Sequence, residues 1–141
     1  MLNIYQPHSA KIIKIEKLSL DTILLRLSFA DKSLQKKFAF VSGQFVQVGL
    51  AGWGECPISI CSSTKDVGIF FELAVRDVGQ LTHKINSLHE GDFLEVRGPF
   101  GNGFNQDFLA DKDLLLIGGG CGFVPLRSLI LDHLFGVLKL N

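Results

Sequence analysis

The sequence predicts a mainly β protein: a small antiparallel barrel or sandwich, followed by one strand–turn–helix unit. Between residues 10 and 100, apolar and polar side chains alternate with a period of two in short segments, which is typical of strands with one buried face. These segments recur about every ten residues and are separated by glycines or polar clusters, as in small all-β domains. After Phe104 the pattern changes, because a polar stretch leads into a continuous apolar run and a glycine-rich turn.

The alternating segments define the expected strands. In residues 11–17, Ile13 and Ile15 fall on one face of the strand. In residues 22–29, alternate side chains are again apolar: Ile23, Leu25, Leu27 and Phe29. Further strands are expected at residues 44–50, 69–75 and 93–97.

One segment within this region has helical spacing instead. Residues 80–88 place Leu81, Ile85 and Leu88 on one helical face, and Gly91 suits the C-terminal end of a helix. We expect this single short helix to plug one end of the barrel.

The C-terminal part is expected to begin an α/β unit. Residues 105–113 are mostly polar and predict a linker, residues 114–117 predict a buried parallel strand, and Pro125 is expected to open a helix running to about residue 138. One such unit cannot stand alone, since a parallel strand needs neighbours and this helix is apolar nearly all round. A deleted domain, a truncated chain and a partner or oligomer that covers the helix all remain open.

Composition excludes several classes of protein. The 141 residues suffice for one domain, with 47% apolar and 20% charged residues. Fourteen basic and fourteen acidic residues cancel, which gives no support for nucleic-acid binding. We expect no signal peptide and no membrane span, because no uninterrupted apolar run approaches ~20 residues. The odd number of cysteines argues against a disulfide framework and favours a cytoplasmic location: Cys56, Cys61 and Cys121.

Four short motifs are candidates for function. GGGCGFVP (residues 118–125) follows the apolar run and suits close approach to a pyrophosphate, or is a plain glycine-rich turn. Residues 55–63 alternate small and apolar side chains, with Ser59 facing either a flat ligand or solvent. Residues 78–82 start the short helix and suit a phosphate, or simply initiate the helix. Residues 97–104 contain turn dipeptides that need no functional explanation.

Taken together, these motifs resemble the ferredoxin–NADP⁺ reductase superfamily over residues 9–131. The matching segments are GQFVQV (43–48), CPIS (56–59), LAVRDVGQLT (73–82), GDFLEVRGPFGNGF (91–104) and LLLIGGGCGFVPLRSLI (114–130). The motifs are most similar to a branch with the gamma subunits of sulfhydrogenases, one of the subunits of anaerobic sulfite reductase and the electron-transfer subunit of dihydroorotate dehydrogenase. The resemblance implies a six-stranded antiparallel Greek-key FAD-binding barrel with one capping helix (1–108) and an incomplete NAD(P)-binding α/β domain (109–141).

The resemblance also implies roles for individual residues. Ser59 would act as the catalytic residue beside the flavin N5, and Ile58 would lie against the ring. The remaining FAD-binding residues would be Cys56 and Pro57 on the same strand, Ala74, Val75 and Arg76 along the ribityl and phosphate path, and Gly79, Leu81 and Thr82 at the pyrophosphate. The turn that would face the nicotinamide and its phosphates contains Gly119, Gly120, Cys121, Gly122 and Pro125.

The sequence departs from the family pattern in ways that bear on function. Cys56 replaces an arginine that pairs with the FAD pyrophosphate, which would cost ~1.5–3 kcal/mol unless Arg76 or Arg97 compensates. Ile58 replaces the usual tyrosine, so ring stacking becomes aliphatic contact. The rest of the nucleotide domain and the four-cysteine [2Fe–2S] segment are absent from the sequence. The C-x4-C spacing of Cys56 and Cys61 lacks a following C-x2-C and is interpreted as coincidence.

The function that this resemblance implies is FAD-dependent electron transfer between NAD(P)H and an iron–sulfur or other redox partner subunit. The cofactor supplies the chemistry, so no acid–base residue or metal ligand is required, and the scattered histidines are interpreted as surface or core residues: His8, His83, His89 and His133. Two alternatives stay open. The first is that the chain is a non-catalytic flavin-binding or docking subunit that cannot bind NAD(P)H alone. The second is that it is a barrel scaffold without flavin.

Overall fold

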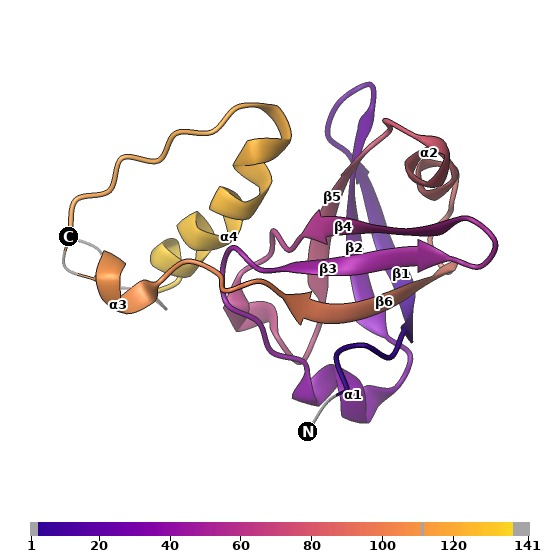
Figure 1. Ribbon diagram of the computed structural model, residues 1–141, viewed down its shortest axis with the longest axis horizontal. Coiled ribbons are helices and arrows are strands. Elements are labelled where there is room, and N and C mark those ends of the chain that lie inside the picture. The colour runs from indigo at the N-terminus through magenta and orange to yellow at the C-terminus, as the bar shows by residue number, and fades with distance from the viewer. Residues whose placement is uncertain (1–2, 111, 137–141) are drawn as a thin grey trace.

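A computed structural model describes residues 3–110 and 112–136 and contains one six-stranded antiparallel sheet (Figure 1). Its strands are β1 (His8–Lys17), β2 (Thr22–Phe29), β3 (Phe45–Leu50), β4 (Gly54–Ser59), β5 (Phe71–Arg76) and β6 (Phe93–Phe100). Their spatial order is β4-β3-β6-β1-β2-β5. A bridge between Ile60 and Leu73 joins the end of β4 to β5 and so closes the sheet. The predicted mainly β class with six antiparallel strands is confirmed.

The core lies inside this closed sheet and is built from alternate strand residues. On β2, the predicted inward face is confirmed, because Ile23, Leu25, Leu27 and Phe29 are all buried in the core cluster. Leu24, on the opposite face of β2, is also buried. Both faces of β2 are therefore covered at this point of the strand.

The predicted inward face of β1 is wrong for Ile13 and right for Ile15, and a β-bulge is the reason. The register of β1 against β2 shifts between Ile12 and Lys14, so Ile13 is an extra residue with no partner on β2. Ala10 and Ile12 are buried before the bulge, whereas Ile13 is 47% exposed. Ile15 packs against the core after the bulge. A one-residue insertion reverses the inward face, so simple alternation fails here.

The predicted short helix is present as α2 (Gln80–Asn86), and it packs against the barrel core. Ile85 is fully buried in the core cluster, and Leu81 and Leu88 lie partly buried against it. The helix ends before Gly91, which instead has a φ of +99° in the turn that enters β6. The prediction that Gly91 ends the helix is therefore wrong; this glycine allows the chain to reverse into β6.

Two short helices were not predicted from periodicity. Helix α1 (Lys32–Lys37) begins after Asp31, whose side chain accepts hydrogen bonds from the backbone of Ser33 and Leu34. Helix α3 (Gln106–Leu109) lies in the expected linker and is capped by Asn105. Such short helices are specified by their caps rather than by an apolar face.

The predicted strand at residues 114–117 is wrong. This segment pairs with no other strand among the described residues, and Leu115 and Ile117 are 86% and 83% exposed. The physical reason is that a parallel strand forms only against a neighbour, and the described residues provide none.

Helix α4 (Phe123–Leu134) begins two residues before Pro125, not at Pro125, and it lies beside the barrel (Figure 1). Proline is tolerated there because the first turn has no intrahelical partner for its missing N–H. Val137 and Leu138, which the predicted helix included, lie outside the described residues. Within those residues, no helix is both long enough and apolar enough to cross a membrane.

Candidate functional site

A pocket between β4, β5, α2 and the glycine turn brings most of the predicted cofactor-binding motifs together. We call it the β4 pocket; its volume is about 350 Å³, within the range of small-molecule sites. Its lining contains Cys56, Pro57, Ile58, Ser59, Ala74, Arg76, Val78, Thr82, Cys121 and Val124. Segments that lie far apart in the sequence therefore meet at one cavity.

The β4 wall of the pocket offers a hydroxyl and two apolar side chains. The Ser59 hydroxyl makes no hydrogen bond within the described part of the chain, so it is available to a ligand. Ile58 pairs with Val46 of β3 and packs partly against the core, which fixes the strand position. Burial raises the pKa of the Cys56 thiol, and the neighbouring Glu55 carboxylate adds to this effect. Cys56 therefore enters the pocket as a neutral thiol at neutral pH.

Arg76 supplies the positive charge of the β4 pocket. Its Nε donates to Asp21 Oδ2 at 2.6 Å across the β2–β5 pairing, where Thr22 lies opposite Arg76. Hydrogen bonding from Arg76 lowers the Asp21 pKa to about 2, and Ser19 and Thr22 contribute to the shift. In return, Asp21 raises the Arg76 pKa, so the guanidinium stays charged and oriented.

The turn at the start of α2 is shaped by the Thr82 hydroxyl. This hydroxyl accepts from the N–H groups of Val78 at 3.0 Å and Gly79 at 2.9 Å, and it donates to the Gly79 carbonyl at 3.0 Å. Its donor and both acceptor directions are thus in use. The first intrahelical bond of α2 comes from His83 N, which leaves the N–H groups of residues 80–82 without an acceptor inside the helix.

Several predicted site residues do not line the β4 pocket. Val75 is fully buried in the core cluster, because side chains of β5 alternate and Ala74 and Arg76 take the opposite face. Leu81 packs against the core instead. Gly79, Gly119 and Gly122 lie next to the pocket, and Pro125 lies in the first turn of α4, but none of them is part of the pocket lining.

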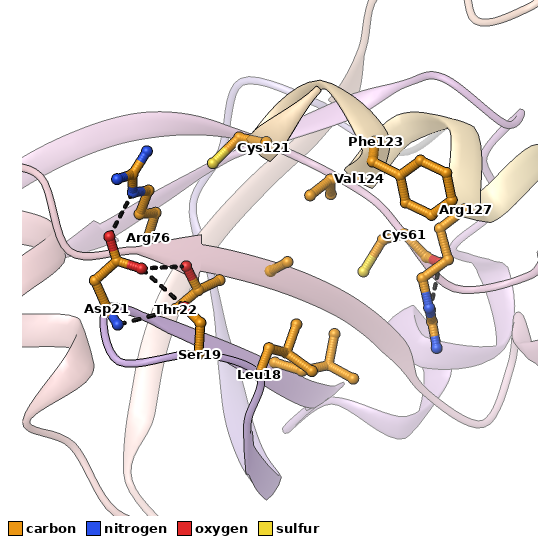
Figure 2. Close-up of a pocket in the computed structure, with 13 residues that line it drawn as sticks. Leu18, Ser19, Asp21, Thr22, Cys61, Arg76, Cys121, Phe123, Val124 and Arg127 are labelled. Atoms are coloured by element: carbon orange, nitrogen blue, oxygen red, sulfur yellow. Dashed lines mark hydrogen bonds and ion pairs between the residues drawn. The ribbon is translucent and has the colours of Figure 1, made fainter. Parts of the chain in front are cut away.

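A second cavity adjoins the first, and we call it the α4 pocket (Figure 2). Its volume is about 460 Å³, and it shares Ala74, Arg76, Cys121 and Val124 with the β4 pocket. Figure 2 shows Asp21, Ser19 and Thr22 at one end and Cys61 and Arg127 at the other. Gly120, which was predicted to face the nicotinamide, lines this cavity rather than the β4 pocket.

Sequence reasoning missed Asp21 and Arg127, which both line the α4 pocket. No local pattern identifies Asp21, since its role depends on the pairing of β2 with β5. Arg97 was a candidate to replace the arginine missing at Cys56. The structure instead pairs its Nε with Glu55 Oε2 at 2.8 Å and places its guanidinium over the Phe100 ring, outside the β4 pocket. Of these two arginines, Arg76 is the one that lines the β4 pocket.

Within residues 3–110 and 112–136, no group of three or more His, Cys, Asp and Glu side chains is placed to hold a metal ion. The described cysteines are all free thiols. The charged side chains that line the two cavities are Arg76, which both share, and Asp21 and Arg127 in the α4 pocket. The β4 pocket adds the Ser59 hydroxyl.

Comparison with curated proteins gives similarity to subunits of multi-subunit oxidoreductases. The chain is 42% identical over 129 residues to sulfhydrogenase 2 subunit gamma of Pyrococcus furiosus, which covers 92% of this chain and 44% of that protein. It is 38% identical over 94 residues to a probable dihydroorotate dehydrogenase B (NAD⁺) electron transfer subunit of Pyrococcus horikoshii, covering 67% and 34%. The chain thus spans less than half the length of these relatives.

Solved structures share the fold. Phthalate dioxygenase reductase superposes with a TM-score of 0.80 at 22% identity, over 95% of this chain and 41% of that one. An NADH-dependent reduced ferredoxin–NADP oxidoreductase gives a TM-score of 0.72 at 27% identity, over 93% and 45%. The family model described as "oxidoreductase FAD-binding domain" matches residues 9–104, which contain β2 to β6, α2 and all of β1 except His8. The chain therefore belongs to the oxidoreductase FAD-binding domain family, with the ferredoxin reductase-like β fold.

Proposed function

We propose that this chain holds FAD and serves in electron transfer between NAD(P)H and an iron–sulfur or other redox partner subunit. The observation that carries this proposal is the β4 pocket, which joins Ser59, Arg76 and the start of α2 in one cavity. Family membership and the names of the relatives support it. The partner and a cytoplasmic location belong to the proposal, because the chain spans only part of its relatives.

The residues present fit a flavin dinucleotide. A flat ring needs a wall of small or apolar side chains, and Pro57, Ile58 and Ala74 provide one. A polar ring edge needs a hydrogen-bonding group, and the unpaired Ser59 hydroxyl lies in the same lining. A diphosphate needs positive charge and N–H donors, which Arg76 and the first turn of α2 supply.

When bound, FAD accepts a hydride and releases electrons one at a time, so the protein supplies position and electrostatics. In this assignment Ser59 would donate a hydrogen bond to the polar edge of the ring, and Arg76, held in orientation by Asp21, would neutralise the diphosphate. The Thr82 hydroxyl is already used by hydrogen bonds within the turn, so Thr82 would act by shaping the start of α2 for backbone donors. Gly119, Gly120, Cys121 and Gly122 in the glycine turn, with Pro125 in the first turn of α4, would face the nicotinamide and its phosphates.

Titration of the purified chain with FAD tests the proposal. We expect quenching of FAD fluorescence and a visible absorption spectrum typical of a protein-bound flavin. Ser59→Ala is expected to bind FAD but to slow its reduction by NADH, whereas Ser33→Ala, on the exposed side of α1, leaves both unchanged. Absence of FAD binding by the wild-type chain would favour a barrel scaffold without flavin and would refute the proposal.

A second function is favoured by one observation: segment 114–117 pairs with no described strand, and residues 115–117 are exposed. In that case the chain is a flavin-binding or docking subunit that cannot bind NAD(P)H alone. Addition of NADH and NADPH to the FAD-loaded chain separates the two functions. Bleaching of the flavin by either nucleotide supports electron transfer from NAD(P)H, and FAD binding without bleaching supports the docking subunit.

A further inference from the structure

Helix α4 is attached to the barrel through polar side chains. Asp132 is fully buried, and its Oδ1 accepts from Ser63 Oγ at 2.7 Å, from Thr64 N at 2.7 Å and from Thr64 Oγ1 at 3.1 Å. Its Oδ2 accepts from Ser42 Oγ, and Ser128 donates to the same Ser42 hydroxyl at 3.2 Å. We call this set of five residues the Asp132 latch.

A second polar contact lies one turn earlier on the same helix. Arg127 Nη1 donates to the Cys61 carbonyl at 2.5 Å and to Glu72 Oε2 at 3.0 Å. Glu72 is nearly fully buried, and its other oxygen accepts from Arg26 at 2.8 and 3.0 Å. The Glu72 carboxylate thus lies between two guanidinium groups and anchors Arg127 to the barrel.

The apolar side chains of α4 do not define how the helix docks. Within residues 123–134, Leu129 is the apolar side chain that is fully buried, and it does not belong to the barrel core cluster. Phe123 and Leu134 are about half or more exposed. Apolar contact is non-directional, whereas hydrogen bonds require particular distances and angles. The Asp132 latch and the Arg127 contact therefore set the rotation and the axial position of α4.

The position of α4 also sets the position of the glycine turn. Gly120–Gly122 forms a short 3₁₀ turn directly before α4, and Cys121 in that turn lines both pockets. A Cβ on Gly118 would lie 2.9 Å from Leu126 Cδ1, so the turn packs closely on the helix. Any shift of α4 along the barrel would carry the turn with it.

We propose that Asp132 is a positioning residue: through the latch it holds the glycine turn over the cofactor pocket, in register for reaction with the nicotinamide. The last step of this inference, the reaction with the nicotinamide, rests on the proposed function. The docking of α4 through the latch does not. Asp132 touches neither pocket lining, so it acts through α4 and not by contact with cofactor or substrate.

The first test needs no cofactor. Cys61 is fully buried beneath α4, and burial raises its pKa to about 12, so its thiol reports on the docking of the helix. We expect Asp132→Ala to raise the rate of Cys61 alkylation by about tenfold or more, because local opening of α4 becomes frequent. Peptide mass spectrometry measures this rate. Asp132→Asn, which keeps one oxygen acceptor, should be intermediate. Asp113→Asn removes an exposed carboxylate and is the matched control with no change.

Deuterium uptake of the glycine turn is measured on the same variants. Gly122 N donates to Gly119 O at 3.0 Å, and we expect its protection to fall in the order wild type, Asp132→Asn, Asp132→Ala. Unchanged Cys61 alkylation and unchanged uptake at residues 118–124 in Asp132→Ala would overturn the proposal. Circular dichroism checks that the barrel is intact in each variant.

The second test uses the FAD-loaded chain and rapid mixing with NADH. Asp132→Ala is expected to lower the limiting rate of flavin reduction by roughly 10- to 100-fold with little change in the affinity for FAD, because misplacement of the turn affects the reaction geometry. Partial recovery in Asp132→Asn supports positioning. Equal limiting rates in wild type and Asp132→Ala would refute the link to reaction. A wild-type chain that binds no FAD would instead refute the proposed function, while the thiol and exchange results still decide the latch.

Discussion

Arg76 is the charged side chain that both cavities share, and its pairing with Asp21 makes it the best single test of the site. We expect Arg76→Gln to weaken FAD binding by about tenfold or more, because one charge-assisted contact to the diphosphate is lost. Fluorescence titration measures the dissociation constant. Arg97→Gln is the matched control, since that arginine is paired with Glu55 outside the pocket. Equal weakening in both variants would contradict the assignment.

The Asp21 carboxylate gives a pH dependence with a defined sign. Its pKa in the folded chain is lowered from 3.8 to about 2, so the ionised form is favoured by folding. The resulting stabilisation is fully present above pH 3.8 and is lost as the pH falls through about 2. We expect the wild type to be more stable than Asp21→Asn in thermal unfolding at neutral pH, with the difference disappearing towards pH 2. A difference that is independent of pH would show that Asp21 acts other than through its charge.

At the residue scale, the sequence identifies types of side chain better than the faces they occupy. Ser59 and Arg76 were predicted for the site and lie in one pocket lining, because strand alternation places them on accessible faces. Val75 was assigned to the same path, but alternation within β5 directs it into the core. Asp21 was not identified because a single sequence does not reveal which residue lies opposite on the next strand.

At the scale of elements, the segment that precedes β3 (residues 41–44) packs against the segment that follows β6 (residues 101–104). Phe104 N donates to Ser42 O at 2.7 Å, and Gln44 Nε2 donates to Gly101 O at 2.7 Å. Gly103 has a φ of +67°, and a Cβ at this position would lie 2.9 Å from Ser42 O. Glycine is required here by both the backbone angle and the close approach.

Gly103→Ala is therefore expected to destabilise the fold by roughly 2–4 kcal/mol, measured by urea unfolding. Gly52→Ala is the control, because Gly52 has a φ of +81° but no atom within 4 Å of the added Cβ. It should show the backbone cost alone, about 1–2 kcal/mol. Equal losses in the two variants would mean that the contact with Ser42 contributes nothing.

The elements that the sequence predicted well are those whose signal is contained within the element. Strand β2 was predicted with its observed bounds, since each of its alternate residues enters the core. The segment 114–117 failed because a parallel strand depends on neighbours outside its own sequence. The polar attachment of α4 was also unpredicted. A helix that is apolar nearly all round suggested burial by apolar contact, whereas Ser128 and Asp132 are buried together with Leu129.

At the scale of the whole molecule, the hydrophobic core cluster contains no residue of the C-terminal helix α4. The members of the core cluster come from β1 through β6 and the segments between them, and none comes from the described residues beyond β6. Helix α4 contacts the barrel through the Asp132 latch and Arg127 rather than through this cluster. This separation supports the proposed boundary between a barrel of residues 1–108 and the segment 109–141.

A chain that ends at Ala110 tests this boundary. We expect it to unfold in one cooperative transition with the circular dichroism of the barrel, because its core is complete. Its affinity for FAD should stay within about tenfold of the 141-residue chain, since β4, β5 and α2 supply Ser59, Arg76 and the N–H donors, while Cys121 and Val124 are lost. Cys61, no longer covered by α4, should be alkylated faster than in the full chain. Loss of cooperative unfolding would show that α4 belongs to the folding unit of the barrel and that the boundary lies elsewhere.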